Sequence, residues 1–255
     1  WPQTLIEIGG HSPNSIIIKT LLWMEKQVYS SANITIILSK GAESYVKERG
    51  AKKVYFLPNG ADLDIFKYSK LVPEDKGFTK NRPFKILYSG AHGECNGLDN
   101  VIQAAELLRS ENIQFIFLGD GPEKSNLIEQ SRDLKNISFE PPIPKVGIPL
   151  IIKNADAIII SLRDKNVFQY GVSPNKLYDA YAIGRPVITT VNGYINNEVN
   201  EYNVGVTAPP EDPKLLAEAI LKLYKLPREA REKMGMNSRK LAESVYSRDL
   251  IINRL

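Results

Sequence analysis

Three polar side chains at a predicted helix start could together hold a phosphate group. Ser173, Asn175 and Lys176 surround Pro174, and Gly184 follows the apolar stretch behind them. This pattern predicts a helix with Ser173 as its N-cap, Pro174 as its first residue and Gly184 just past its end. The free N–H groups at a helix N-terminus carry partial positive charge, and Lys176 adds a cation. We therefore expect an anion, and a phosphate in particular, to bind at this corner.

Two glycine loops are further candidates for contact with a phosphate. Gly90-Ala-His-Gly93 follows one predicted strand, and Gly119-Asp-Gly121 follows another. Glycine lets backbone N–H groups approach an anion closely, and ligands of open α/β sheets gather at the carboxyl ends of strands. Each loop is equally consistent with an ordinary turn between a strand and a helix. Neither contains G-x-G-x-x-G or Gly-Lys-Ser/Thr, so a dinucleotide site or a Walker-type site is not indicated.

The candidates for metal binding and acid–base chemistry are few. His92 is one of two histidines, and its place in a glycine loop leaves a ligand-binding role and a structural role open. Asp62 and Asp64 form a D-x-D pattern like that of some nucleotide-sugar enzymes, but they follow a Pro-Asn-Gly turn signature, which favours a structural role. No other group of His, Asp or Glu has metal-ligand spacing, and no Ser-His-Asp order or G-x-S-x-G occurs. We expect no bound metal ion.

The composition is that of an ordinary globular protein. The chain has 255 residues, of which 43% are hydrophobic and 24% charged, with a net charge of +4. This mildly basic balance fits anionic ligands, a membrane surface or scattered solvated lysines. No basic stripe is interleaved with aromatic residues, so nucleic acid is not an expected partner. No apolar run reaches the ~18 residues of a membrane span, and the single cysteine, Cys95, excludes an internal disulfide and suits the cytoplasm.

The alternation of apolar segments predicts a doubly wound parallel sheet. Short runs rich in β-branched and aromatic residues indicate strands, and apolar residues at helical spacing indicate helices between them. The expected strands are 35–38, 54–57, 84–89, 114–118, 137–139, 157–161, 187–189 and 204–206, and the expected helices are 14–31, 39–49, 98–109, 123–132, 146–153, 174–183, 215–223 and 228–245.

These elements divide the chain into four parts. Residues 1–66 form a βαβ pattern that begins in the middle of a domain, so partner strands are expected upstream. The start at Trp1 is neither a signal peptide nor a natural Met start, which also indicates a fragment or a processed chain. Residues 67–82 are polar and unpatterned, as in an interdomain linker. Residues 83–240 contain a complete Rossmann-like unit, and residues 241–255 predict a carboxy-terminal helix that returns to the first domain.

Four motifs in a fixed order resemble those of a known family. They are N-G-A-D-L-D-I-F at 59–66, G-D-G-P-E at 119–123, N-A-D-A-I-I-I at 154–160 and L-Y-D-A-Y-A-I-G-R-P-V-I at 177–188. Over residues 15–250 the chain resembles the carboxy-terminal part of a glycosyltransferase family 4 enzyme of GT-B fold. The segments 90–93 and 173–176 are similar to those of a bacterial subgroup that adds N-acetylated sugars, such as N-acetylfucosamine, during surface polysaccharide assembly.

The resemblance implies a reaction and a division of labour. The carboxy-terminal Rossmann-like domain would bind a nucleotide-diphosphate sugar, with a UDP-N-acetylated sugar expected. The amino-terminal domain would bind a lipid-linked or saccharide acceptor, and transfer would retain the anomeric configuration without a metal or a cofactor. The expected location is the cytoplasm, with peripheral contact at the inner face of the cell membrane. Because the general acid/base belongs to the missing amino-terminal half, the present chain is expected to bind a UDP-sugar weakly and to transfer nothing.

The chain departs from the family pattern at its charged positions. Two glutamates of the family, eight positions apart, fall on Gly171 and Asp179. Asp179 could accept hydrogen bonds from the ribose hydroxyls, whereas Gly171 leaves the sugar contacts open. The Arg and Lys that clamp the phosphates in the family fall near Ala91 and Asn96. We expect Lys176 and the helix N-terminus to take over the diphosphate charge.

Further positions and two other functions stay open. Glu198 falls on the glutamate of the family's G-G-x-x-E segment, with one or two extra residues between, and Arg163 and Lys165 could face either phosphate or solvent. A nucleotide-sugar 2-epimerase of the same fold is one alternative, but it would need carboxylates and histidines in its cleft, and only His92 is visible. A non-catalytic nucleotide-sugar-binding module is the other, and Gly171 is the departure that suggests it.

Overall fold

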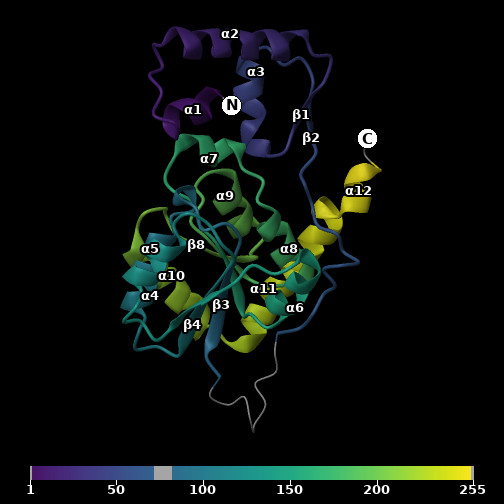
Figure 1. The fold of residues 1–255 in the computed structure, drawn as a ribbon. Coiled ribbons are helices and arrows are strands. Elements are labelled where there is room, and N and C mark those ends of the chain that lie inside the picture. The colour runs from purple at the N-terminus through teal and green to yellow at the C-terminus, as the bar shows by residue number, and fades with distance from the viewer. Residues whose placement is uncertain (1, 72–81, 254–255) are drawn as a thin grey trace.

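The computed structural model describes residues 2–71 and 82–253, and its main body is a parallel sheet between two layers of helices (Figure 1). The strands are β3 (Phe84–Ser89), β4 (Ile113–Leu118), β5 (Ile137–Glu140), β6 (Ala157–Ile160), β7 (Val187–Thr189) and β8 (Gly205–Thr207). They pair in the order β5-β4-β3-β6-β7-β8, and every pairing is parallel. The order changes direction between β3 and β6, and ligands of open α/β sheets bind at the carboxyl ends of the strands at such a point.

Helices cover both faces of the six-stranded sheet (Figure 1). One layer holds α4 (Leu98–Leu107), α5 (Lys124–Gln130) and α10 (Pro213–Lys225), and the other holds α6 (Ile148–Lys153), α8 (Asn175–Ile183) and α11 (Arg228–Leu241). Successive strand residues point to opposite layers: Ile86 and Ile159 pack in the core beneath α4 and α10, and Leu87 and Ile158 pack beneath α8. Burial on both faces explains why these strands are continuously apolar in the sequence.

The first part of the chain lies beyond one end of this body, at the top of Figure 1. It consists of α1 (Pro2–Glu7), α2 (Ile16–Ser31), β1 (Thr35–Ile37), α3 (Glu43–Glu48) and β2 (Val54–Phe56). The strands β1 and β2 form a parallel two-stranded sheet, and a small core of Ile37, Val46 and Ala51 lies beside it. The side chain of Ser15 caps α2 by accepting a hydrogen bond of 3.2 Å from the N–H of Ile18.

Apolar side chains on this first part face solvent. Ile17, Trp23 and Val28 on α2 are 68%, 63% and 62% exposed, and Ile36 on β1 is 54% exposed. The apolar stripe predicted for residues 14–31 is therefore present on α2. Its end at Tyr29 packs against the small core, but much of the stripe is exposed. Such a patch marks an interaction surface when it is large.

The carboxy-terminal end of the chain lies against the segment that follows β2. After α11, a π-helical turn (Ala242–Tyr246) leads into α12 (Arg248–Ile252). The N–H of Ala61 donates to the carbonyl of Tyr246 over 2.7 Å, and the N–H of Arg248 donates to the carbonyl of Ala61 over 3.1 Å. These bonds join residue 61, which follows β2, to the segment after α11.

The described part of the predicted linker is attached to the sheet domain. Arg185 is fully buried, and its guanidinium donates to the carbonyls of Ser69 (2.6 Å), Lys153 (2.7 Å) and Ala155 (2.9 Å). Leu71 is buried as well. The rest of the predicted linker, residues 72–81, lies outside the described residues. Residues 67–71 are therefore held by the loop after α8 through the buried guanidinium of Arg185.

Several predicted element boundaries were wrong. The helix expected over 39–49 begins later, because a 3-10 turn (Lys40–Ala42) precedes α3 (Glu43–Glu48). The predicted helix over 228–245 stops being an α-helix at Leu241. Three helices of six to eight residues were not predicted, because they are too short to show a helical period: α1, α7 (Asn166–Gly171) and α9 (Tyr194–Glu201). The helix α12 lies within the carboxy-terminal helix expected over 241–255. No helix among the described residues is long and apolar enough to span a membrane.

Candidate functional site

A cavity of about 620 Å³ opens at the carboxyl ends of β3 and β4, beside the start of α8. The two glycine loops form one wall, the first turn of α8 forms another, and the segment before α6 forms the third. The polar and glycine residues that line it include Gly90, Gly119, Lys145, Asn175, Lys176 and Asp179. Five of these six residues were predicted from the sequence, and Lys145 was not. The cavity occupies the switch point of the sheet.

The glycine loops are packed directly against each other. The N–H of Gly90 donates to the carbonyl of Leu118 over 2.9 Å, and the N–H of His92 donates to that of Asp120 over 2.8 Å. A Cβ on Gly119 would lie 2.0 Å from the carbonyl oxygen of Gly90, and Gly119 has a φ of +142°. A side chain at Gly119 would therefore force the loops apart. Gly121 is required for the same reason, since its Cβ would lie 2.5 Å from the His92 oxygen.

Lys176 brings an unpaired cation to the cavity. Its Nζ lies 3.9 Å from the centroid of the Tyr88 ring, and a Cβ on Gly90 would lie 3.0 Å from it. Within the described residues Lys176 forms no ion pair and no hydrogen bond. Burial lowers the pKa of Lys176 to about 8. An anion in the cavity would therefore meet a cation that no carboxylate neutralises.

Asp179 places a carboxylate one turn further along α8. Burial raises the pKa of Asp179 to about 6, although the positive charges of Lys145 and Arg248 act in the opposite direction. The carboxyl group is half-buried and has no hydrogen-bond partner within the described part of the chain. It can therefore accept hydrogen bonds from hydroxyl groups of a ligand in the cavity.

The prediction that Ser173 caps α8 was wrong. The helix begins at Asn175, Pro174 occupies the N-cap position with an extended backbone, and no side chain bonds the N–H groups of the first turn. The Ser173 hydroxyl instead forms a hydrogen bond of 2.8 Å with the hydroxyl of Tyr178, and the Ser173 carbonyl accepts one of 3.3 Å from Asn59. The Ser173 hydroxyl therefore bonds Tyr178 and not the N–H groups at the start of α8. Ser173 therefore contributes to the site through the shape of the chain before α8.

His92 is part of the aromatic core and does not line the cavity. It is 0% exposed, and its ring lies 5.9 Å from Tyr88, 6.3 Å from Phe117 and 5.9 Å from Phe139. Burial is the main reason that the pKa of His92 is lowered, and the charge of Lys124 adds to it. His92 is therefore a neutral side chain under the glycine loop, and its placement favours the structural role. Gly93 lines a separate cavity of about 120 Å³.

Glu198 lies in a cage of tyrosines away from the cavity. Its carboxylate accepts hydrogen bonds from Tyr181 (3.2 Å), from Tyr194 (2.7 Å) and from Tyr246. Burial raises the pKa of Glu198, and the three hydroxyls oppose that rise. Lys40 of the first part lies over the Tyr194 ring, 5.9 Å from its centroid. The cage therefore joins α9, α8 and the carboxy-terminal turn beside the first part of the chain, which is a structural role.

Two other predicted positions also have structural roles. The carboxylate of Asp62 accepts hydrogen bonds of 3.0 Å from the N–H groups of Asp64 and Ile65, so the D-x-D pattern forms a turn. Arg163 forms an ion pair of 2.8 Å with Asp99. Gly171 is the last residue of α7. Within the described residues, no group of three or more His, Cys, Asp or Glu side chains is placed to hold a metal ion.

A small apolar cavity continues from the site. It has a volume of about 300 Å³ and is lined mainly by aliphatic side chains, among them Leu87, Ile116 and Ile151. Leu118 and Ile143 line both cavities. The site therefore has a charged end at Lys176 and an apolar end beneath α6.

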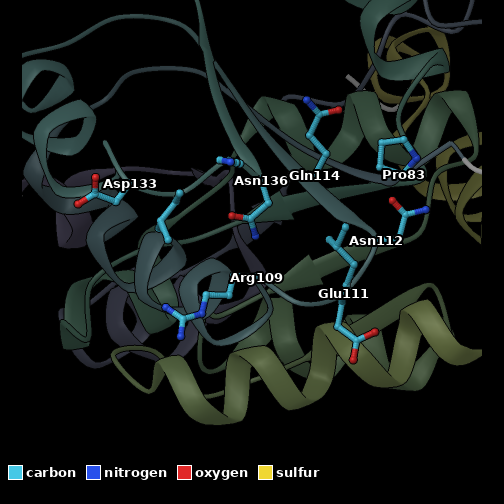
Figure 2. A pocket seen from close by; sticks show the side chains of 10 residues that line it. Pro83, Arg109, Glu111, Asn112, Gln114, Asp133 and Asn136 are labelled. Carbon is cyan, nitrogen blue, oxygen red and sulfur yellow. The ribbon is translucent and has the colours of Figure 1, made fainter.

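Figure 2 shows a different cavity, at the opposite edge of the sheet. Its volume is about 470 Å³, and Asn112 and Gln114 at the start of β4 line it together with Arg109 and Asp133. This edge carries the amino ends of the strands, where open α/β sheets do not bind their ligands. We therefore assign the site to the cavity beside α8.

Comparison with known proteins identifies the family. The model of the family described as glycosyl transferases group 1 matches residues 73–241. The chain is 26% identical over 247 residues to the probable glycosyltransferase WbjE of Pseudomonas aeruginosa, covering 89% of this chain and 58% of WbjE. It is 29% identical over 212 residues to the putative colanic acid biosynthesis glycosyl transferase WcaI of Escherichia coli K12, covering 76% of this chain and 49% of WcaI.

A solved structure shares the fold. The structure of Alr3699/HepE from Anabaena, in complex with UDP and glucose, matches with a TM-score of 0.75 at 17% identity, over 99% of this chain and 68% of that one. The chain belongs to the glycosyl transferases group 1 family, and its fold is α/β of the GT-B type with Rossmann-like topology. It spans about half the length of the curated relatives that it matches, 58% and 49%.

Proposed function

We propose that this chain is the donor-binding part of a retaining glycosyltransferase. The enzyme would move a sugar from a nucleotide-diphosphate sugar, in particular a UDP-N-acetylated sugar, to a lipid-linked or saccharide acceptor, without a metal or a cofactor. The family supports a glycosyltransferase, and the similar fold of Alr3699/HepE was solved with UDP and glucose. The name of WcaI refers to colanic acid biosynthesis, which supports a role in surface polysaccharide assembly.

The observation that carries the proposal is the unpaired ammonium group of Lys176. It lies over the glycine loop at the mouth of a cavity, beside a helix start whose N–H groups no side chain occupies. A fixed cation and aimed N–H groups stabilise the negative charge of a departing diphosphate. In this proposal Lys176 and Asn175 hold the diphosphate, and the backbone of Gly90 and Gly119 shapes the wall opposite.

The two ends of the site fit the remaining parts of a nucleotide. Asp179 lies one turn beyond Lys176 on α8, where its carboxylate can accept hydrogen bonds from the ribose hydroxyls. The apolar end near Leu118 and Ile143 suits the flat face of a base. Lys145 stands between the two regions as a second cation near Asp179.

The acceptor would be bound by chain that precedes the present first part. The exposed apolar faces of α2 and β1, with Ile17, Trp23, Val28 and Ile36, support upstream strands and helices that cover them. The same upstream part would supply the general acid/base, so the present chain is expected to transfer nothing by itself. We expect the complete enzyme to work in the cytoplasm, with peripheral contact at the inner face of the cell membrane where a lipid-linked acceptor would lie.

The site favours transfer over epimerisation. An epimerase would need histidines and carboxylates in its cleft, but His92 is buried behind the glycine loop, and the acids that line the cavity are Asp120 and Asp179. Transfer to a lipid-linked acceptor by the full-length enzyme would support the proposal. Release of an epimerised UDP-sugar without an acceptor would contradict it, and donor binding without either reaction would indicate a binding module.

Titration calorimetry with UDP tests the donor site on the present chain. Removing the Lys176 charge in Lys176→Met should weaken UDP binding tenfold or more, since a charge-assisted hydrogen bond contributes about 1.5–3 kcal/mol. Lys135→Met is the matched control, because Lys135 lines the cavity of Figure 2 at the other edge of the sheet. Its UDP affinity should stay within twofold of the unchanged chain. Equal affinity in Lys176→Met and the unchanged chain would refute the assignment of the site.

A further inference from the structure

Tyr88 lies directly beneath the ammonium group of Lys176, at the start of the glycine loop 90–93. It is the penultimate residue of β3 and is 1% exposed. The face of its ring carries the Nζ of Lys176 at 3.9 Å from the centroid. Its hydroxyl donates to the carbonyl of Ala91 over 2.6 Å. The Tyr88 side chain, at the end of β3, therefore contacts the glycine loop at Ala91 and the ammonium group of Lys176, the lysine proposed to bind the diphosphate.

The Tyr88 ring cannot move easily. It packs against Phe117 at 6.2 Å and His92 at 5.9 Å between ring centroids, and Phe117 stacks on Phe139 at 5.0 Å. These side chains lie in close-packed core, where rotation would create voids. The ring is therefore a fixed surface, whereas a lysine side chain has four rotatable bonds and no preferred direction by itself.

Lys176 has no other group to hold it. A buried ammonium is normally paired with a carboxylate, and in the described residues Lys176 has none. The negative face of an aromatic ring attracts a cation, and more strongly when the cation is desolvated. The ring of Tyr88 can therefore stabilise the charged form of Lys176 without neutralising it, which leaves the full charge for an anionic ligand.

We infer that Tyr88 is a positioning residue of the donor site: its ring holds the Lys176 ammonium over Gly90, and its hydroxyl fixes the glycine loop at Ala91. This inference rests on the proposed function, since it assigns Tyr88 a task in binding the diphosphate. Tyr88 touches no ligand. It acts through Lys176 and through the loop backbone.

Five other ionisable side chains lie around Lys176, and the Tyr88 variants retain all of them. Asp120, Lys145 and Asp179 line the same cavity. Lys124 donates to the carbonyl of Gly119 over 2.8 Å at the loop behind it. His92 lies below, against the Tyr88 ring. Tyr88→Leu and Tyr88→Phe both remove the hydroxyl bond to Ala91 and keep these five groups, so a difference in the proton affinity of Lys176 between the two variants reports on the ring.

The first readout needs no ligand. NMR titration of the present chain labelled with ¹³C at the lysine ε carbons would follow the pKa of Lys176. In Tyr88→Leu the pKa should fall by about one unit, a tenfold loss of proton affinity. In Tyr88→Phe it should stay within about 0.3 of the unchanged chain because the ring remains. Phe115→Leu is the matched control: it removes a buried ring of β4 that forms no ring contact with Tyr88 within the described residues, and it should leave this pKa unchanged.

The second readout is UDP affinity in a double-mutant cycle. At pH 9, above the Lys176 pKa of about 8, Tyr88→Leu should raise the Kd for UDP about tenfold, because the charged fraction of the lysine falls with its proton affinity. In the Lys176→Met background the same change should raise the Kd less than threefold, since only its effect through the loop backbone remains. Tyr88→Phe should raise the Kd less than threefold. If Tyr88→Leu fails to fold, Tyr88→Met replaces it, because the flexible methionine fills the same space without a ring.

The results separate this inference from the proposed function. An unchanged Lys176 pKa and UDP affinity in Tyr88→Leu would overturn the role of Tyr88 and leave the donor site standing. Equal effects of Tyr88→Leu with and without Lys176 would also overturn it, because they would show a merely structural role. If the unchanged chain bound no UDP, the donor proposal would fail, and the NMR titration would still decide whether the ring holds the ammonium.

Discussion

Replacing Lys176 by methionine should stabilise the ligand-free chain at neutral pH. The folded structure buries the ammonium without a carboxylate and lowers the pKa of Lys176 from 10.5 to about 8. That difference corresponds to a cost of roughly 3 kcal/mol for the charged form in the folded state. The contact with the Tyr88 ring returns about 1 kcal/mol when lysine is present. We therefore expect the free energy of unfolding of Lys176→Met to exceed that of the unchanged chain by about 2 kcal/mol at pH 7.

The gain should depend on pH in a defined window. Between pH 8 and pH 10.5 the unfolded chain holds the proton that folded Lys176 has lost. The free energy of unfolding of the unchanged chain therefore rises with pH across this window. The advantage of Lys176→Met should be full below pH 8 and should disappear by about pH 10.5.

Urea denaturation at pH 7, 9 and 10.5 measures this difference, with Lys135→Met as the exposed control that should show none of it. A loss of stability in Lys176→Met at pH 7 would refute the reasoning. A gain that is the same at every pH would refute it as well, because it would arise from packing and not from the charge. A ligand-binding role explains why an unfavourable charge is placed in this cavity.

Three further predictions test other parts of the structure. UDP affinity should fall below pH 6 as Asp179 takes up a proton, because its pKa is raised to about 6, and the fall should be smaller in Asp179→Asn, where only the terminal phosphate of UDP titrates; calorimetry from pH 5 to 7 checks this, and equal profiles in the two chains would contradict it. Arg185→Ala should lower the free energy of unfolding by about 3–5 kcal/mol, since it leaves the carbonyls of Ser69, Lys153 and Ala155 without their donor; a loss no larger than that of the exposed Arg109→Ala would show that these bonds are not needed. Glu198→Gln should cost about 1–3 kcal/mol by weakening the three tyrosine hydrogen bonds, with UDP affinity within twofold of the unchanged chain; a larger loss of UDP binding would place Glu198 in the donor site.

The sheet and its layers could be predicted because each strand is buried on both faces. Segments such as 157–160 are therefore continuously apolar, and the helices between them show one apolar stripe each. The predicted α/β class with Rossmann-like topology was confirmed for this reason. The short helices α7 and α9 were not predicted, because six and eight residues contain too few turns to show a helical repeat of apolar residues.

The tasks of single residues depended on partners far away in the sequence. Ser173 has the residue type of a helix cap, but the hydroxyl of Tyr178 competes for it. His92 stands in a glycine loop, but its side chain turns into a cluster of rings that come from three other strand positions. Local propensity cannot anticipate such tertiary contacts.

Several residues that were predicted for the candidate site lie together in the structure. Gly90, Gly119, Asn175, Lys176 and Asp179 do line one cavity. Lys145 and Tyr88 were missed because neither lies in a motif. The one signal that could have indicated Tyr88 is its position at the end of β3, just before the glycine loop. An aromatic ring at that position lies beneath any side chain that reaches over the loop.

The most direct test of the central claim is to find where UDP binds on the present chain. A ¹H–¹⁵N correlation spectrum recorded during a UDP titration reports each backbone N–H. We expect saturating shifts at Gly90, Gly119, Lys176 and Asp179, with the N–H signals of Asn112 and Gln114 unchanged. Shifts confined to Asn112 and Gln114, in the cavity of Figure 2, or no shift at any UDP concentration, would contradict it.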